Sequence, residues 1–445
     1  MQLPLEYTLP QPQLRPEVVA APSQAAKLRL LLEGDLNFHG QKGEDPLHAL
    51  HPFPAKFPPA LPRLFIRHLT GPGDHVLDPM MGSGTTILEA HRLGRVALGT
   101  DIDPLALRLV AAKANPPAPA LFESAFHAVL TRARQMLENP QDLAVLRETR
   151  LDAPTRAFAD YWFLPQTQQE LLALSAAIEE SPPAMQPFLR VVFSSIIIAK
   201  SGSVAQARDL SHTRPHKVAK APRSAVEAFR AKARRALRLL AQMPPRPSVS
   251  PWLSEADAQR LPFATNSVHL IVTSPPYAAN AIDYMRAHKF SLIWWGYSIR
   301  ALGALRKEYI GGEALQGFEM EALPPAAMQA VAEVAAVDAR KGKVLHRYFS
   351  EMRRGLSEMG RVLAPEGVAV LVVGESTMRG VPARVPQSLA AIGEQVGLRC
   401  VGIGERQLDR DRRMMPTRRG GIGSAIEKRM HSEYVLGFLK EGDVS

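Results

Sequence analysis

The feature that most constrains the fold is an apolar segment that runs directly into a turn with two glycines. Residues 75–86 read His-Val-Leu-Asp-Pro-Met-Met-Gly-Ser-Gly-Thr-Thr, and a helical pattern follows over 87–93. A second apolar segment, 95–101, ends in an acid and precedes a helix that the sequence predicts over 104–114. Strand, turn, helix, strand and helix in this order indicate a βαβα unit, which builds a parallel sheet covered by helices.

The same alternation returns in the second half of the chain. The strands predicted there cover 268–273, 367–374, 398–403 and 433–439, and the predicted helices cover 282–296 and 384–396. The predicted fold class is therefore α/β with a mostly parallel sheet.

Changes of composition divide the chain into four parts. The segment between the two α/β halves reads mainly as helices and is rich in basic residues. The predicted parts are an N-terminal arm over 1–44, a first α/β half over 45–115, a helical basic insertion over 116–250, and a second α/β half over 251–445 with a smaller insertion at 298–342.

Composition excludes several classes of protein. The chain has 445 residues, of which 46% are hydrophobic, which is enough for a sizeable core. Its one cysteine, Cys400, can form neither an intramolecular disulfide nor a Cys-x-x-Cys pair. No apolar run approaches the roughly 18 residues that cross a bilayer, and the first residues do not read as a secretory signal. We therefore expect a protein of a reducing compartment, with no membrane partner.

The glycine turn restricts the cofactor. A dinucleotide site needs a third glycine where this chain has Ile87, and a Walker loop needs a lysine that does not follow Gly84. What remains is a ligand with an adenosine and no phosphates. Gly82 and Gly84 would let the backbone approach that ligand, and Asp101 at the end of the second strand would accept its ribose hydroxyls.

A second motif follows the strand predicted over 268–273. Ser274 is followed by Pro275, Pro276 and Tyr277. Two consecutive prolines cannot continue a sheet, so they stiffen a turn at the carboxyl edge, where open α/β sheets bind ligands.

With these motifs the chain resembles the S-adenosylmethionine-dependent DNA methyltransferases that act on amino nitrogens. The hallmark of that family is Asp, Asn or Ser before Pro-Pro-Tyr or Pro-Pro-Phe. Three further segments match it: 51–58 (His-Pro-Phe-Pro-Ala-Lys-Phe-Pro), 78–86 and 257–262. The resemblance covers roughly 45–115 and 250–440. It implies a Rossmann-like methyltransferase fold with a seven-stranded sheet, S-adenosyl-L-methionine as cofactor, and a bacterial or archaeal protein of the cytoplasm and nucleoid.

The resemblance also assigns roles to residues. Ser274, Pro275, Pro276 and Tyr277 are the catalytic candidates: the Ser274 side chain and the Pro275 carbonyl accept the hydrogens of the target amine, and the Tyr277 ring stacks on a flipped base. The candidates for cofactor binding are Asp78, Pro79, Gly82, Gly84, Thr85, Asp101, Asp103 and Asp257, with Pro54, Lys56 and Phe57 upstream.

Cysteine and histidine spacing excludes other chemistries. Methylation at ring carbon 5 of cytosine uses a thiolate, but Cys400 lies in a late apolar strand, far from Pro275 and Pro276. A zinc deaminase needs a Cys-x-x-Cys pair. His212 and His216 have no third ligand at metal spacing, so we predict no metal site.

The net charge of +11 is concentrated in two segments. Residues 200–240 carry eleven Lys and Arg against two acids, and 405–430 carry eight against four. A helix predicted over 223–240 has an apolar face and several arginines elsewhere. The candidates for nucleic-acid contacts are Arg208, His212, Arg214, His216, Arg230, Arg234, Arg235, Arg238, Arg412, Arg413, Arg418 and Arg419.

We expect a site-specific methyltransferase acting on double-stranded DNA. Ser274, in place of Asp, favours the N4 nitrogen of cytosine over the N6 nitrogen of adenine. An RNA amino methyltransferase and a non-catalytic nucleic-acid-binding protein stay as alternatives. Either insertion can serve target recognition. The recognition sequence, the oligomeric state and a partner restriction enzyme cannot be predicted from these residues.

Overall fold

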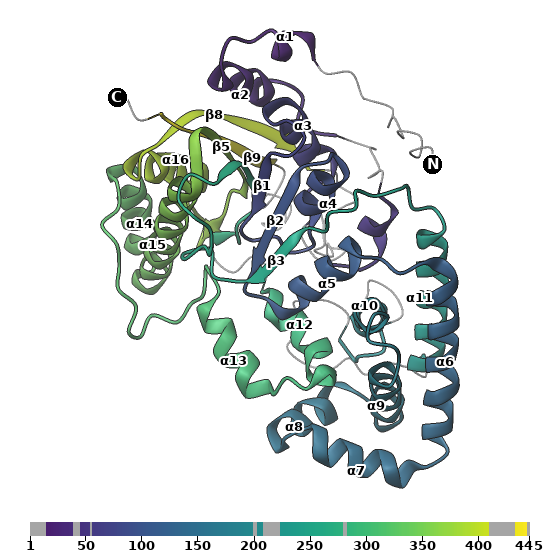
Figure 1. Cartoon of the computed structure of the whole chain (residues 1–445). Helices are drawn as coiled ribbons and strands as arrows, with labels where there is room; N and C mark the ends of the chain where they lie inside the picture. The colour runs from purple at the N-terminus through teal and green to yellow at the C-terminus, as the bar shows by residue number, and fades with distance from the viewer. Residues whose placement is uncertain are drawn as a thin grey trace, which may run out of the picture.

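Seven strands form one mostly parallel sheet. The computed structural model describes residues 15–38, 45–53, 56–198, 203–207, 223–278, 283–408 and 432–442. The strands of the sheet are β1 (His75–Asp78), β2 (Val96–Asp101), β3 (Trp252–Glu255), β4 (Val268–Thr273), β5 (Leu363–Gly374), β8 (Leu398–Gln407) and β9 (Ser432–Lys440). They lie in the order β3-β2-β1-β4-β5-β9-β8 (Figure 1), and β9 runs antiparallel to both of its neighbours. The prediction of a Rossmann-like methyltransferase fold is therefore confirmed.

The central strands are buried on both faces, as their apolar sequence requires. In β5, Val370 and Val372 point into one core, and the alternate residues Leu371 and Val373 point into the other. The helices that supply the first of these cores are α2 (Gln24–Glu33), α3 (Ala60–Leu69), α4 (Thr85–Arg92) and α5 (Pro104–Ala114). Those that supply the second are α14 (Pro325–Val337), α15 (Ala339–Val362) and α16 (Val385–Gln395).

The N-terminal part of the described chain is built into this core. After the short helix α1 (Pro16–Val19), the Ser23 hydroxyl caps α2 by accepting the backbone N–H of Ala26 at 3.2 Å. Helix α2 then lies against β8 and β9. The approach is so close that a Cβ on Gly437 would come within 2.7 Å of a Leu32 methyl. The N-terminal segment thus completes the core on one face of the sheet.

The segment between β2 and β3 forms a separate helical layer (Figure 1). Its helices are α6 (Pro119–Leu137), α7 (Pro140–Arg150), α8 (Ala153–Trp162), α9 (Pro165–Glu179), α10 (Gln186–Ile197) and α11 (Ala225–Leu240). Their apolar core is continuous with α5 and with Phe53. The predicted apolar face of α11 is confirmed, because Val226, Phe229 and Leu240 are all buried.

The segments after β4 depart in part from the prediction. The helix expected over 282–296 is α12 (Tyr284–Leu292) followed by the 3₁₀ turn η3 (Ile293–Trp295). The second insertion contains α13 (Ile299–Glu308), α14 and the start of α15, and Gly311 lies between α13 and α14. Sequence analysis missed β3, because it has four residues and lies at the sheet edge, where its side chains do not alternate in burial.

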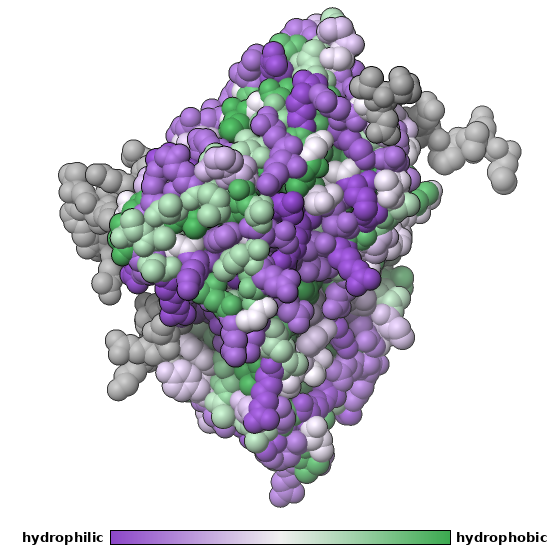
Figure 2. Space-filling model, turned by 90° about the vertical axis from the view of Figure 1, so that its left-hand side faces the viewer, coloured by the Kyte–Doolittle hydropathy of each residue, from purple (hydrophilic) through white to green (hydrophobic). Residues whose placement is uncertain are grey.

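The remaining short elements are the 3₁₀ helix η1 (Pro46–Ala49) and a two-stranded ribbon of β6 (Thr377–Met378) and β7 (Val381–Pro382). The side of the molecule that carries α14 and α15 is covered mainly by hydrophilic residues, with smaller hydrophobic areas between them (Figure 2). None of the helices in the described ranges has the length and apolar composition needed to cross a bilayer.

The packing of α2 predicts that the N-terminal segment contributes to stability. Leu28 is fully buried, whereas its neighbour Arg29 is exposed. Leu28→Ala should lower the free energy of unfolding by about 3 kcal/mol, because it removes buried methyl groups and leaves a cavity. Urea denaturation measures this, with Arg29→Ala as the matched control. Equal stability of the two variants would show that α2 is not part of the cooperative core.

Candidate active site

A cavity lies at the carboxyl ends of β1, β2 and β4. Its empty volume, including the part open to solvent, is about 850 Å³. Eleven of the predicted site residues line it: Lys56, Phe57, Asp78, Pro79, Gly82, Thr85, Asp101, Asp103, Asp257, Ser274 and Pro276. The two motifs, which are nearly 200 residues apart in the sequence, thus meet in one cavity. The hydrogen bond between Thr273 and Asp78, which are 195 residues apart, joins them directly.

The glycine turn requires both glycines, for different reasons. Gly82 and Gly84 have φ of +45° and +76°, a left-handed conformation that other residues rarely adopt. Gly82 lines the cavity. Gly84 does not, but a Cβ there would lie 2.6 Å from a Val110 methyl, so its lack of a side chain lets α4 begin directly against α5.

Two side chains hold this turn in place. The Asp101 carboxylate accepts the backbone N–H of Gly82 at 2.8 Å, and the Lys113 ammonium donates to the Ser83 carbonyl at 2.8 Å. Lys113 is fully buried, and this desolvation places its pKa well below the usual value. These two bonds hold the turn in the shape described.

Buried carboxylates give the cavity a negative character. Asp78 accepts a hydrogen bond from the Thr273 hydroxyl at 2.7 Å and one from the Met80 N–H at 3.2 Å, and burial raises its pKa to about 6. Burial, followed by the charge of Asp103, raises the pKa of Asp101 to about 7. Such groups are suited to a ligand that brings hydrogen-bond donors or positive charge.

Asp103 has its two oxygens already engaged. One oxygen caps α5 by accepting the Leu105 N–H at 2.8 Å, and the other lies 2.5 Å from Nδ1 of the buried His288. Burial acts to raise the pKa of Asp103, but the charge of His288 and the hydrogen bonds from His288, Tyr309 and Leu105 together more than offset it, and the pKa is lowered overall. Asp103 lines the cavity as a support for its wall more than as a free acceptor.

Only part of the Ser-Pro-Pro-Tyr motif lines the cavity. Ser274 and Pro276 face the cavity, whereas Pro275 and Tyr277 are outside its lining. The Tyr277 hydroxyl donates to Glu433 at 2.7 Å. Gly84, Pro275 and Tyr277 are thus the described catalytic and cofactor candidates that do not line the cavity.

Aromatic side chains that sequence analysis missed form one wall. Phe53, Tyr284 and Tyr309 line the cavity, and the rings of Phe53 and Tyr284 are stacked with centroids 5.9 Å apart. Phe53 lies inside the matched segment 51–58, so its neighbours could have indicated it. Tyr284 and Tyr309 belong to no motif, and no local signal marks them.

The basic candidates are only partly described. On α11, Arg234, Arg235 and Arg238 are exposed, and Arg230 forms an ion pair with Glu227. The predicted residues that lie outside the described part of the chain are Pro54, Arg208, His212, Arg214, His216, Arg412, Arg413, Arg418 and Arg419. Among the described residues, no cluster of three or more His, Cys, Asp or Glu is arranged to hold a metal ion.

Comparisons with known proteins find methyltransferases similar to this chain. A family model described as DNA methylase, of the N6/N4 type, matches residues 34–112. Type II methyltransferase M.MvaI of Kocuria varians is 22% identical over 77% of this chain and 80% of its own length. Over residues 34–112 the chain therefore matches a DNA methylase family model, and over most of its length it is similar to a Type II methyltransferase.

Other matches are shorter or weaker. Type II methyltransferase M.MjaII of Methanocaldococcus jannaschii is 36% identical over 81 residues, which is 18% of this chain and 15% of that protein. A solved SAM-dependent methyltransferase from Methanosarcina mazei is 11% identical to this chain. The match covers 85% of this chain and 97% of that protein, with a TM-score of 0.30. That score is too low to bear on the fold, which stands on the order of the strands.

S-adenosylmethionine is the cofactor of the methyltransferases that the chain resembles, and the cavity residues fit it. Gly82 leaves backbone exposed to the ligand, while Asp78 and Asp101 offer carboxylates to its donors and its positive charge. Asp257, which lines the cavity beyond β3, would accept from the adenine amino group. The cofactor supplies an electrophilic methyl group.

The raised pKa of Asp101 predicts that cofactor affinity depends on pH. Ribose hydroxyls bind the carboxylate better than the protonated acid, so affinity should fall as the pH drops through 7. One group that titrates near pH 7 gives a loss of about tenfold between pH 8 and pH 6. Calorimetric titration with S-adenosylmethionine measures the dissociation constant at each pH.

Asp101→Asn is the control for this titration. This variant should bind the cofactor more weakly than the wild type at pH 8. Its affinity should fall by no more than about twofold between pH 8 and pH 6, because only the titration of Asp78 then remains. A wild-type affinity that stays constant over this interval would show that Asp101 does not contact the cofactor.

Proposed function

We propose that this chain transfers a methyl group from S-adenosylmethionine to the exocyclic amino nitrogen of a base in double-stranded DNA, at cytosine N4. The observation that carries the proposal is that Ser274 and Pro276 line the same cavity as Asp78, Gly82 and Asp101. A base held at the Pro-Pro-Tyr turn would therefore lie next to the cofactor residues.

The proposed chemistry needs acceptors more than a strong base. The lone pair of an exocyclic amine is conjugated with the ring, which makes the nitrogen a poor nucleophile. If the Ser274 hydroxyl oxygen and the Pro275 carbonyl accept the two amine hydrogens, the nitrogen can pyramidalise and direct its lone pair outward. The base must leave the duplex to reach this turn, and the Tyr277 ring offers a face on which it can stack.

The choice of cytosine rests on Ser274. In the family that the chain resembles, serine before Pro-Pro-Tyr is typical of cytosine N4 enzymes. Adenine N6 is the second candidate, because the same tetrapeptide serves both amines. The M.MvaI relative is described as a Type II methyltransferase, and we infer by analogy that a restriction enzyme can accompany the present chain.

Target recognition is proposed for the helical insertion over 116–250, with the smaller insertion over 298–342 as the rival. The exposed arginines of α11 support the first choice, because phosphate contacts hold a duplex in register. The division into arm, two α/β halves and two insertions is part of the same proposal.

Methylation assays test the substrate. We expect label from tritiated S-adenosylmethionine to enter duplex DNA and not tRNA or rRNA, and nucleoside analysis of the product to yield N4-methylcytosine. Ser274→Ala should lower kcat about 100-fold, because an acceptor that acts in the transition state is lost, while cofactor affinity is unchanged.

Each other outcome assigns a different function. N6-methyladenine as the product would overturn the choice of base. Label that enters only RNA would overturn the DNA substrate. Cofactor binding without transfer to any polynucleotide would identify a non-catalytic nucleic-acid-binding protein.

The role of α11 predicts a change in the salt dependence of DNA binding. Replacing Arg234, Arg235 and Arg238 by Gln should reduce the slope of log K against log salt by about 2 to 3, since each phosphate contact contributes about 0.9. Fluorescence anisotropy with duplex DNA measures the slope. Replacing Arg29 and Lys343, which are exposed and lie outside both insertions, is the control. An unchanged slope in the α11 variant would show that these arginines do not contact the phosphates of DNA.

A further inference from the structure

Three residues form one row across the last strands of the sheet. Gly374 at the end of β5 pairs with Glu433 of β9, and Glu433 pairs with Arg406 of β8. Residues that are directly opposite in antiparallel strands have side chains on the same face. The row lies at the carboxyl edge of β5, which is the edge where β4 leads into Ser274 and Tyr277.

Tyr277 contacts two members of this row, Gly374 and Glu433. Its ring lies against Gly374, where a Cβ would come within 3.0 Å of the ring carbon Cε2. Its hydroxyl donates to one oxygen of Glu433 at 2.7 Å. Burial, followed by the charge of Glu433, places the pKa of Tyr277 well above its usual value, so the hydroxyl stays protonated as a donor.

The second oxygen of Glu433 is held by Arg406. The Arg406 guanidinium donates to it at 2.6 Å, and the two side chains are only 6% and 12% exposed. Charge-assisted bonds of this length are strong and directional, and solvent screens a buried pair little. Glu433 therefore has a fixed position from which it can orient Tyr277.

We propose that Glu433 is a positioning residue for methyl transfer, which holds the Tyr277 ring in the orientation that receives the flipped base and is itself held by Arg406. This inference rests on the proposed function. Stacking alone needs a ring but no hydroxyl. The hydroxyl bond fixes the ring plane beside Ser274, so that a stacked base presents its amine to the acceptors.

The inference is tested by a double-mutant cycle on the full chain. Tyr277→Phe keeps the ring and removes the hydroxyl, and Glu433→Ala removes its partner. Each should lower kcat on duplex DNA about tenfold, the rate equivalent of one hydrogen bond to a charged group. If Glu433 acts through Tyr277, the double variant should be no slower than either single one. Cofactor affinity, measured by calorimetry, should stay at the wild-type value in all three.

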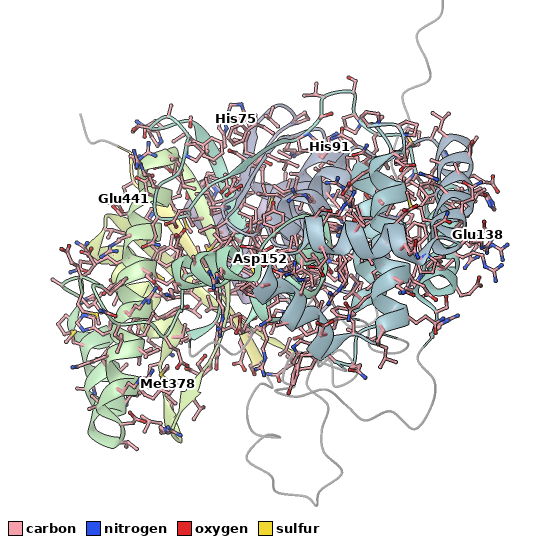
Figure 3. All side chains as sticks on the ribbon, turned by 90° about the horizontal axis from the view of Figure 1, so that it is seen from below. His75, His91, Glu138, Asp152, Met378 and Glu441 are labelled. Carbon is pink, nitrogen blue, oxygen red and sulfur yellow. The ribbon has the colours of Figure 1, made fainter. Side chains whose placement is uncertain are left out.

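Two further variants separate positioning from stability. Glu433→Gln keeps an oxygen that can accept the Tyr277 hydroxyl, so it should recover most of the kcat lost in Glu433→Ala. Glu441→Ala breaks the exposed ion pair with Arg399 and should leave kcat unchanged. Glu441 lies at the opposite end of the sheet from Met378, which follows the carboxyl end of β5 (Figure 3).

The outcomes are distinct. Additive losses in the double variant, or wild-type kcat in Glu433→Ala, would overturn the positioning role and leave the proposed function intact. Wild-type protein that transfers no methyl group to DNA would overturn both. Equal losses in Glu433→Ala and Glu433→Gln, with lowered melting temperatures in both, would show that Glu433 acts on stability alone.

Discussion

The site depends on a buried hydrogen bond between two distant parts of the chain. Thr273, the last residue of β4, donates its hydroxyl to Asp78, the last residue of β1. These strands are neighbours in the sheet, so the bond ties the start of the glycine turn to the start of the Pro-Pro-Tyr turn. Because a hydroxyl solvates the buried carboxylate, Asp78 can stay close to the apolar strands without a cation. Together with the pairing of the two strands, this bond places the cofactor residues and the catalytic residues relative to each other.

The sequence predicted what local chemistry determines. The glycine turn, Asp101 and Ser274 follow strands whose apolar runs are easy to recognise, and the structure brings them to one sheet edge. The rest depends on contacts between segments far apart. Tyr284 and Tyr309 reach the cavity from α12 and from the end of α13, where nothing in the surrounding residues marks them.

Asp103 is a second case in which contacts between distant segments determine the role of a residue. The resemblance indicated it as a cofactor residue, but its oxygens cap α5 and bond to a histidine 185 residues away. No spacing in the sequence indicates that partner. The basic segments around Arg208 and Arg412 lie outside the described residues, so their roles stay predictions from charge.

The helical insertion shares its core with the wall of the cavity. Ser194 of α10 donates to Ser291 of α12 at 2.9 Å and also contacts the ring of His51 at 3.0 Å, and Phe53 packs into the same apolar cluster. A transplanted insertion would therefore have to match these partners as well as its own helices. We expect new sequence specificity in such a scaffold to arise by changes on the outer surfaces of the insertion, with its inner face kept constant.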